Sequence, residues 1–136
     1  MSVIVKISKD ADPEDILKEE FLQEKAAVLG RAGEKVYAAL ENMRGIAKII
    51  EDLSVSYNQI VERCREPSDD SNLMFLRKQA LKELNAEISR FNRVREHAKL
   101  RYYYLIVTRE AMGLRRHHWI EDIYGIPPKK THIQDE

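Results

Sequence analysis

Two adjacent histidines near the carboxyl end are the residues best suited to chemistry. In the stretch GLRRHHWIEDIYGIPPKK, residues 113–130, each has a carboxylate one helical turn further on: His117 precedes Glu121, and His118 precedes Asp122. A zinc site needs three or four such ligands, and its specific signatures, HExxH or paired CxxC, are missing from the sequence. We therefore favour ion pairing at a helix end and keep a metal site at these four residues as the weaker alternative.

A stripe of basic side chains is the second candidate site. At 100° per residue its members fall within a narrow arc of one helix, roughly opposite the apolar seam: Arg90, Arg93, His97 and Arg101. Such a stripe can contact phosphates or an acidic partner. Because no surface aromatics and no RNA-binding motif accompany it, a solvated helix face is favoured, with anion or partner binding as the alternative.

Catalysis has no support in the sequence. We find no nucleophile paired with a base, no glycine-rich phosphate loop after a strand and no paired carboxylates in an evident cleft. The sequence therefore indicates no catalytic residue and no cofactor, and a non-enzymatic role is favoured.

The composition is typical of a helical protein in one domain. The chain has 136 residues, of which 34% are charged, with only five Gly and four Pro and a formal net charge of +0. A single cysteine excludes an internal disulfide framework and fits a reducing compartment. No stretch approaches the ~18 apolar residues of a membrane span. We expect a cytoplasmic protein with no membrane partner.

A first long helix is predicted over 12–66. Asp12 can cap it and Pro13 suits its first position. Apolar or small residues then recur in alternating steps of four and three, the seam of a coiled coil: Leu22, Ala26, Leu29, Gly33, Val36, Leu40, Met43, Ala47, Ile50, Ser54, Tyr57, Val61 and Cys64. A bend near Gly30–Gly33 is left open. Residues 1–11 form an N-terminal arm, in which SVIVKIS is either loose or a strand paired across a dimer.

A second long helix is predicted over 70–112, since Pro67 ends the first and Gly113 is a plausible stop. Its seam contains Met74, Leu81, Leu84, Ile88, Phe91, Ala98, Tyr102, Leu105 and Met112. A short third helix follows over 114–124. Residues 126–136 are expected to form a tail, whose last residues, KKTHIQDE (129–136), look disordered.

Two long helices joined by a short turn lie antiparallel, so residue i should face roughly residue 136 − i. The acidic start of the chain (Glu14, Asp15, Glu19, Glu20) would then face Arg115, Arg116, His117 and His118. The predicted fold is all-α: a single domain, 1–136, made of a long antiparallel, coiled-coil-like hairpin and a short C-terminal helix.

The segment YYYLIV, residues 102–107, should be buried on several sides because its apolar residues surround the helix. Gly30 and Gly33 would leave room for the rings of Tyr102, Tyr103 and Tyr104. The third helix, with Trp119, Ile120, Ile123 and Tyr124, could fold back over the segment, so that RRHHWIEDIYGIPP closes the hairpin. A second subunit would cover the remainder and complete a four-helix bundle as a dimer.

Two segments, FLQEKAAVLGRAGEKVYAALENM and YYYLIVTREAMGLRRHHWIEDIYGIP, resemble a small bacterial family of helical proteins, a domain of unknown function. That family has an E-K-A-x-x-L-G-R-x-G stretch, and an R-E-A-x-G-L-R stretch before a Tyr-x-x-Pro ending. The two matches cover under half of the chain, and this sequence has a longer middle, about 44–100. The resemblance implies a helical fold and says nothing about chemistry.

These observations favour a non-enzymatic interaction or scaffold module in the bacterial cytoplasm. A homodimer is expected, with a further protein partner open. The alternative is an anion- or nucleic-acid-binding regulator that uses the basic stripe, in which nucleic acid is the less favoured ligand.

Overall fold

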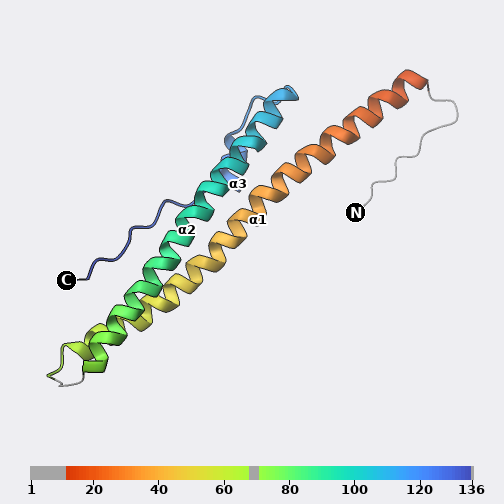
Figure 1. Cartoon of the computed structure of the whole chain (residues 1–136). Helices are drawn as coiled ribbons and strands as arrows, with labels where there is room; N and C mark the ends of the chain where they lie inside the picture. The colour runs from red at the N-terminus through yellow and green to blue at the C-terminus, as the bar shows by residue number, and fades with distance from the viewer. Residues whose placement is uncertain (1–11, 68–70, 136) are drawn as a thin grey trace.

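Two long antiparallel helices lie side by side in the computed structural model, which describes residues 12–67 and 71–135 (Figure 1). They are α1, Pro13–Cys64, and α2, Ser71–Ala111, and a short helix α3, His118–Ile123, follows them. The described residues contain no strand. The predicted all-α hairpin with a short C-terminal helix is therefore confirmed. The predicted arm, 1–11, with its candidate strand SVIVKIS, lies outside the described residues.

The start of α1 follows the sequence signals closely. Asp12 has an extended backbone, and its carboxylate accepts a hydrogen bond of 3.2 Å from the backbone N–H of Glu14. Pro13 occupies the first helical position, where no N–H is needed. The helix then runs for 52 residues and is not interrupted at Gly30 or Gly33.

The predicted seams meet between α1 and α2 along most of their length. On α1 every seam residue from Leu29 to Cys64 is buried or half-buried, and on α2 the deepest are Leu84, Ile88, Phe91, Ala98 and Leu105. The first seam residues, Leu22 and Ala26, are exposed. The reason is visible in Figure 1: α1 extends beyond the end of α2, and this part of α1 has no neighbouring helix.

The predicted register holds at that end of the hairpin. One cavity is lined from α1 by Val28, Ala32 and Lys35, and from α2 by Thr108 and Tyr104, together with Arg101. Residue numbers on opposite walls sum to about 136, as the antiparallel pairing requires. The hairpin turn is thus centred where the sequence placed it.

Gly113 ends α2 as predicted. It has a positive φ of 86°, and its N–H donates to the carbonyl of Glu110 at 3.0 Å, while Leu114 N–H donates to the carbonyl of Arg109 at 2.9 Å. This pair of bonds is a Schellman motif, which reverses the chain. Residues 114–117 form that reversal, so α3 begins at His118 and not at residue 114.

The prediction for the tyrosines and glycines is partly wrong. Tyr103 and Tyr104 are 61% and 48% exposed, so the segment 102–107 is not covered on all sides. A Cβ at Gly33 would lie 2.9 Å from the hydroxyl oxygen of Tyr124, whereas nothing lies within 4 Å at Gly30. Gly33 therefore makes room for Tyr124, which the chain reversal brings back to α1, and not for a ring of α2.

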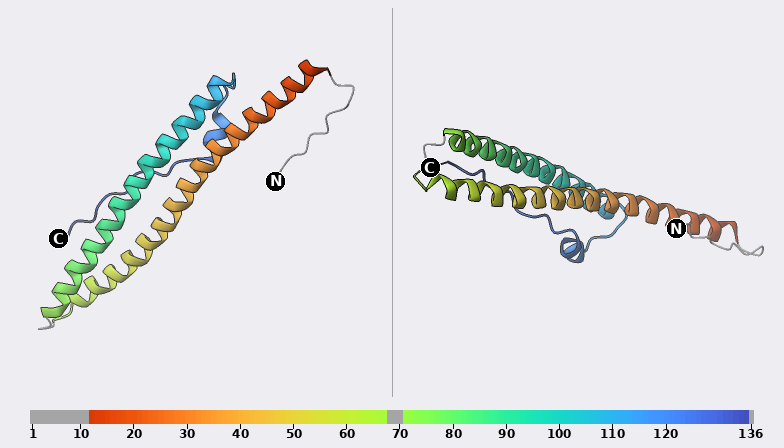
Figure 2. Two further views of the ribbon diagram at one scale, coloured as in Figure 1. Left: turned by 45° about the vertical axis from the view of Figure 1, so that its right-hand side comes forward. Right: turned by 90° about the horizontal axis from the view of Figure 1, so that it is seen from below.

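The prediction of disorder over 129–136 is also wrong for its described part, residues 129–135. Residues 124–135, here called the tail, continue from α3 back along the hairpin towards its closed end (Figure 2). Side chains of α2 bind this segment through its backbone, as described below. Residue 136 lies outside the described residues.

Candidate functional site

The structure does not assemble a metal site from His117, His118, Glu121 and Asp122. The Nδ1 of His117 accepts a hydrogen bond of 3.3 Å from Arg109 Nε, and its Nε2 lies 3.2 Å from Glu110 Oε1. Both ring nitrogens are engaged, with the proton on Nε2 donated to Glu110. The side chains of His118, Glu121 and Asp122 are exposed, and within the described ranges no group of three or more metal-ligating side chains forms.

Arg109 is the centre of the turn between α2 and α3. It is only 8% exposed, donates to the carbonyl of Arg116 at 3.0 Å, and lies 4.9 Å from the centre of the Trp119 ring. A guanidinium over an aromatic face is a cation–π contact. The segment predicted to close the hairpin is thus attached to the end of α2 by contacts of Arg109.

The predicted pairing of this segment with the acidic start of α1 is wrong. Glu14, Asp15, Glu19 and Glu20 are all exposed, and within residues 12–67 and 71–135 no ion pair joins them to the basic turn. Because Gly113 reverses the chain, residues 115–118 lie beside the end of α2, while residues 13–24 extend away from it (Figure 1). We call residues 13–24 the overhang.

The residues of the predicted basic stripe differ in exposure and in their contacts. Arg90 forms an ion pair of 3.2 Å with Glu87, and Arg93 and His97 are exposed. Arg101 is half-buried and faces α1 across a cavity of about 270 Å³. Three of the four predicted residues are thus exposed on α2, and the fourth lines a cavity against α1.

That cavity is a basic site of its own. Two further cations line it, Arg31 and Lys35 on α1, together with Tyr104 and three apolar or hydroxyl side chains. Among the described residues that line it there is no carboxylate. Sequence reasoning missed both α1 cations, although the 136 − i register places Lys35 opposite Arg101. The arrangement suits an anion the size of a phosphate group.

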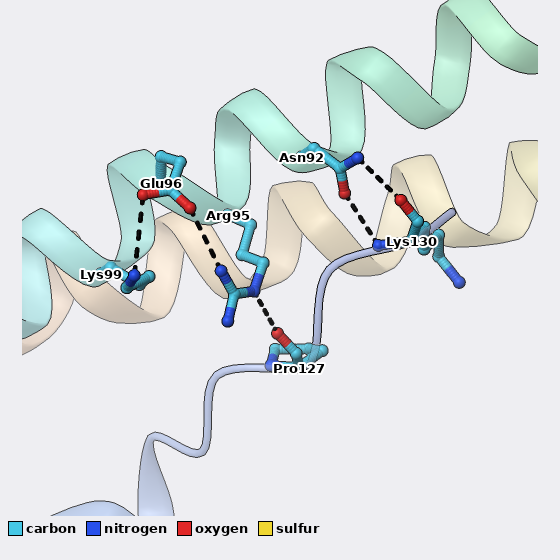
Figure 3. Close-up of polar contacts among 6 residues, drawn as sticks. All are labelled: Asn92, Arg95, Glu96, Lys99, Pro127 and Lys130. Atoms are coloured by element: carbon cyan, nitrogen blue, oxygen red, sulfur yellow. Dashed lines mark hydrogen bonds and ion pairs between the residues drawn. The ribbon is translucent and has the colours of Figure 1, made fainter. Parts of the chain in front are cut away.

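The tail is held by a row of polar side chains on α2, which we call the polar ladder (Figure 3). Asn92 donates to the carbonyl of Lys130 and accepts from its N–H, both at 2.9 Å. Asn85 makes the same pair of bonds to Ile133, at 2.9 and 2.8 Å. Each asparagine thus satisfies both backbone groups of one tail residue, as a neighbouring β-strand would.

Three further members complete the ladder. Arg95 Nε donates to the carbonyl of Pro127 at 2.8 Å, and Ser89 Oγ lies 2.7 Å from His132 Nε2. At the far end Arg77 forms an ion pair of 2.7 Å with Asp135. The polar ladder is therefore Arg77, Asn85, Ser89, Asn92 and Arg95.

Asp135 also joins the tail to α1. The Tyr57 hydroxyl donates to its carboxylate at 3.2 Å. Burial, and after it the hydrogen bond to Asp135, raises the pKa of Tyr57 above its ordinary value of 10.0. The hydrogen bond from Arg77 to the same carboxylate raises the pKa of that guanidinium.

Tyr102 is a second tyrosine with a raised pKa. Burial first, and the negative charge of Glu121 next, raises the pKa of Tyr102. Glu121 is in α3 and Tyr102 is in α2. Ile120, 3% exposed, is the residue of α3 that joins the core.

Comparison with known proteins gives no match, whether to a family model, to a curated protein or to a solved structure. In the part of the chain that the structure describes, no helix has the length and apolar character needed to cross a membrane.

Proposed function

We propose that the chain is a non-enzymatic helical interaction module that assembles as a homodimer through the overhang. The observation that carries this proposal is the uncovered apolar surface of residues 13–24. Leu17, Phe21 and Leu22 are 65%, 59% and 62% exposed on a helix with no neighbour there. Covering each side chain would contribute about 1.5–3 kcal/mol, so a contiguous set of this kind marks a binding surface.

A surface of matching character lies at the turn after α2. A hollow of about 370 Å³ is lined there by Leu114 and Trp119, which are 40% and 46% exposed. Arg115 and Arg116 line the same hollow and are exposed. The overhang holds five carboxylates and one lysine. An acidic apolar surface and a basic apolar surface are therefore present on one chain, unpaired with each other.

The occupant that fits the hollow is the overhang of a second copy. In this arrangement Phe21 of one protomer enters the hollow of its partner, and Glu20 and Glu24 face Arg115 and Arg116. A twofold axis makes the same contact twice, giving a closed dimer in which both charged surfaces are used. The charge pairing predicted within one hairpin is then made between two chains.

Sedimentation velocity over a range of concentrations tests this proposal. The intact chain should sediment as a dimer at about 100 µM, because two apolar contacts with charge support give at least micromolar affinity. Phe21→Glu should give a monomer, since it removes the aromatic ring that fills the hollow and leaves Leu114 and Trp119 uncovered. Val55→Glu is the matched control: Val55 is 53% exposed on the same helix but remote from both surfaces, and this variant should remain dimeric.

Two results would contradict the homodimer. One is an intact chain that stays monomeric up to about 100 µM. The other is a dimer that Phe21→Glu leaves intact while Val55→Glu dissociates it, which would place the interface on the other half of the hairpin.

Anion binding at the basic cavity is the second candidate function. Its support is the convergence of Arg31, Lys35 and Arg101 from two helices with no carboxylate among them. The test is the binding of a fluorescent single-stranded oligonucleotide at several salt concentrations. Three phosphate contacts predict a logarithmic salt slope of about −2. Lys35→Glu with Arg101→Glu should abolish binding, whereas the exposed stripe residue Arg93, changed to Glu, should leave most of it.

Oligonucleotide binding that the double variant does not weaken would refute a role for the cavity. No binding at low salt would remove nucleic acid from the candidate ligands, and a titration with inorganic phosphate would then decide whether the cavity takes a small anion.

Kinship with the small bacterial helical family, and with it a cytoplasmic setting, is part of the same proposal. It is supported by residues 21–43 and 102–127, which carry the resemblance. In the structure these segments contribute the overhang's Phe21, the lining of the basic cavity apart from Arg101, and the contact of Tyr124 with Gly33. The resembling residues are thus grouped at the open end of the hairpin, where the proposed dimer surfaces lie.

A further inference from the structure

The tail is bound in the manner of an extended peptide ligand. Asn85 and Asn92 are seven residues apart, about 10.5 Å along a helix. Their targets Ile133 and Lys130 are three residues apart, about 10 Å along an extended chain. The helix therefore presents two amide groups at the repeat of an extended backbone. The tail runs antiparallel to α2, as its stretch from Pro127 to Lys130 shows in Figure 3.

The hold on this segment is polar more than apolar. Thr131, Ile133, Gln134 and Asp135 are all exposed, so little apolar surface is buried in this part of the tail. The two asparagines contact backbone groups alone and accept any residue with a free N–H. Main-chain bonds of this kind provide affinity in peptide recognition, while side-chain contacts provide selectivity.

Three side chains of the tail are contacted: His132 by Ser89, and the charged residues Lys130 and Asp135, which give the ladder its selectivity. The Lys130 ammonium lies 4.9 Å from the centre of the Phe91 ring, a cation–π contact. Five positions later, Asp135 binds Arg77 and Tyr57. The site thus binds a basic side chain at Lys130 and an acidic side chain at Asp135.

We propose that the polar ladder is a binding site for an extended peptide of a partner protein, with a basic residue five positions before an acidic one. Residues 127–135 of the same chain occupy the site in cis and satisfy that pattern. Because a tethered ligand acts at an effective concentration of about millimolar, the partner segment must compete with the tail. This site is separate from the dimer surfaces and does not depend on them.

The test uses the full chain with its tail released. Lys130→Pro with Ile133→Pro removes both backbone N–H groups that the asparagines bind, and leaves the ladder intact. The probe is a labelled synthetic peptide of residues 126–135, IPPKKTHIQD, followed by fluorescence anisotropy. The released-tail variant should bind the peptide one to one. The unmodified chain should bind it at least about 10-fold more weakly, because its own tail competes.

Matched controls isolate the ladder. Asn85→Leu with Asn92→Leu, added to the released-tail variant, should weaken peptide binding by at least about 10-fold, as should prolines at the same two positions of the peptide. A peptide with the final Asp changed to Lys should also bind more weakly. A folded released-tail variant that does not bind the peptide, or that binds it equally after loss of both asparagines, would overturn the proposal.

A second measurement needs no variant. Excess peptide added to the unmodified chain should accelerate hydrogen exchange at the amides of Lys130 and Ile133 by displacing the tail, and the proline-bearing peptide should not. Unchanged exchange at saturating peptide would refute the proposal even if the released-tail variant fails to fold. The two tail prolines can also be combined with Phe21→Glu, and the product compared with Phe21→Glu alone by sedimentation. If the two proteins sediment differently, tails are exchanged between copies, and this result would overturn the proposal that each tail occupies the ladder of its own chain.

Discussion

Ile120 and Trp119, adjacent in α3, should differ sharply in what they contribute to stability. The sequence placed both residues in the helix expected to fold back over residues 102–107, and singled out Trp119 with Ile123 as the cap of that segment. In the structure Trp119 is 46% exposed and rests on Arg109, whereas Ile120 is 3% exposed and belongs to the core. Replacing each by Ala therefore separates a surface contact from a core contact within one turn of helix.

The expected magnitudes follow from burial. Ile120→Ala removes a fully buried side chain and leaves a cavity, which costs about 3 kcal/mol. Trp119→Ala removes one cation–π contact and part of a half-exposed ring, about 1 kcal/mol. For 136 residues the entropy of unfolding is about 0.29 kcal/mol/K, so Tm should fall by about 10 °C and about 3 °C respectively.

Urea unfolding followed by far-ultraviolet circular dichroism measures both losses. Trp119 is the single tryptophan of the chain, so its fluorescence in Ile120→Ala also reports whether α3 remains docked. Equal losses for the two variants, or a larger loss for Trp119→Ala, would refute the assignment of Ile120 as the residue that anchors α3.

Two further predictions concern α1. Gly30→Ala should raise the free energy of unfolding by about 0.5–1 kcal/mol, because helix propensity improves and a new Cβ meets nothing within 4 Å; Gly33→Ala should gain less, since the Tyr124 hydroxyl must move. Urea titration of both variants decides this, and a larger gain at Gly33 would contradict it. Because the folded pKa of Tyr57 is raised, its contribution is complete below about pH 10 and is lost as pH rises through the folded value. Between about pH 9 and about pH 11 the free energy of unfolding should therefore decrease more for the intact chain than for Tyr57→Phe. An equal decrease in the two proteins would refute the role of that hydroxyl.

The hairpin could be predicted because the spacing of apolar residues along each helix shows which face of that helix must be buried against the other. Steps of four and three from Leu29 to Cys64 predicted the buried face of α1. Asp12, Pro13 and Gly113 predicted two helix ends, because capping depends on the residues next to the end.

The chain reversal at Gly113 accounts for the error at the open end. The sequence indicated that α2 stops there and that the third helix could fold back, but residues 115–118, expected to face the acidic start of α1, lie beside the end of α2 instead. Charges that would have met within one chain are consequently separated, and Tyr124 is brought to Gly33. The direction of a chain after a glycine turn depends on tertiary contacts such as that of Ile120 with the core.

The polar ladder had no signal in hydrophobic periodicity. Residues 129–136 read as disordered because their composition is polar, and a polar segment buries too little apolar surface to order itself. In the structure residues 129–135 are ordered by hydrogen bonds with Asn85, Ser89 and Asn92. These three uncharged residues recur at one helical face, beside the seam, and that spacing is the feature that could have predicted the ladder.

A charge-exchange experiment tests the proposed dimer most directly. One chain carries Glu20→Arg with Glu24→Arg on its overhang, and the other carries Arg115→Glu with Arg116→Glu at its turn. In the proposed arrangement each chain alone meets like charges and should sediment as a monomer, whereas an equal mixture restores opposite charges at both contacts and should form a heterodimer. A mixture that remains monomeric, when the unmodified chain is a dimer, would contradict the pairing of the overhang with the basic turn.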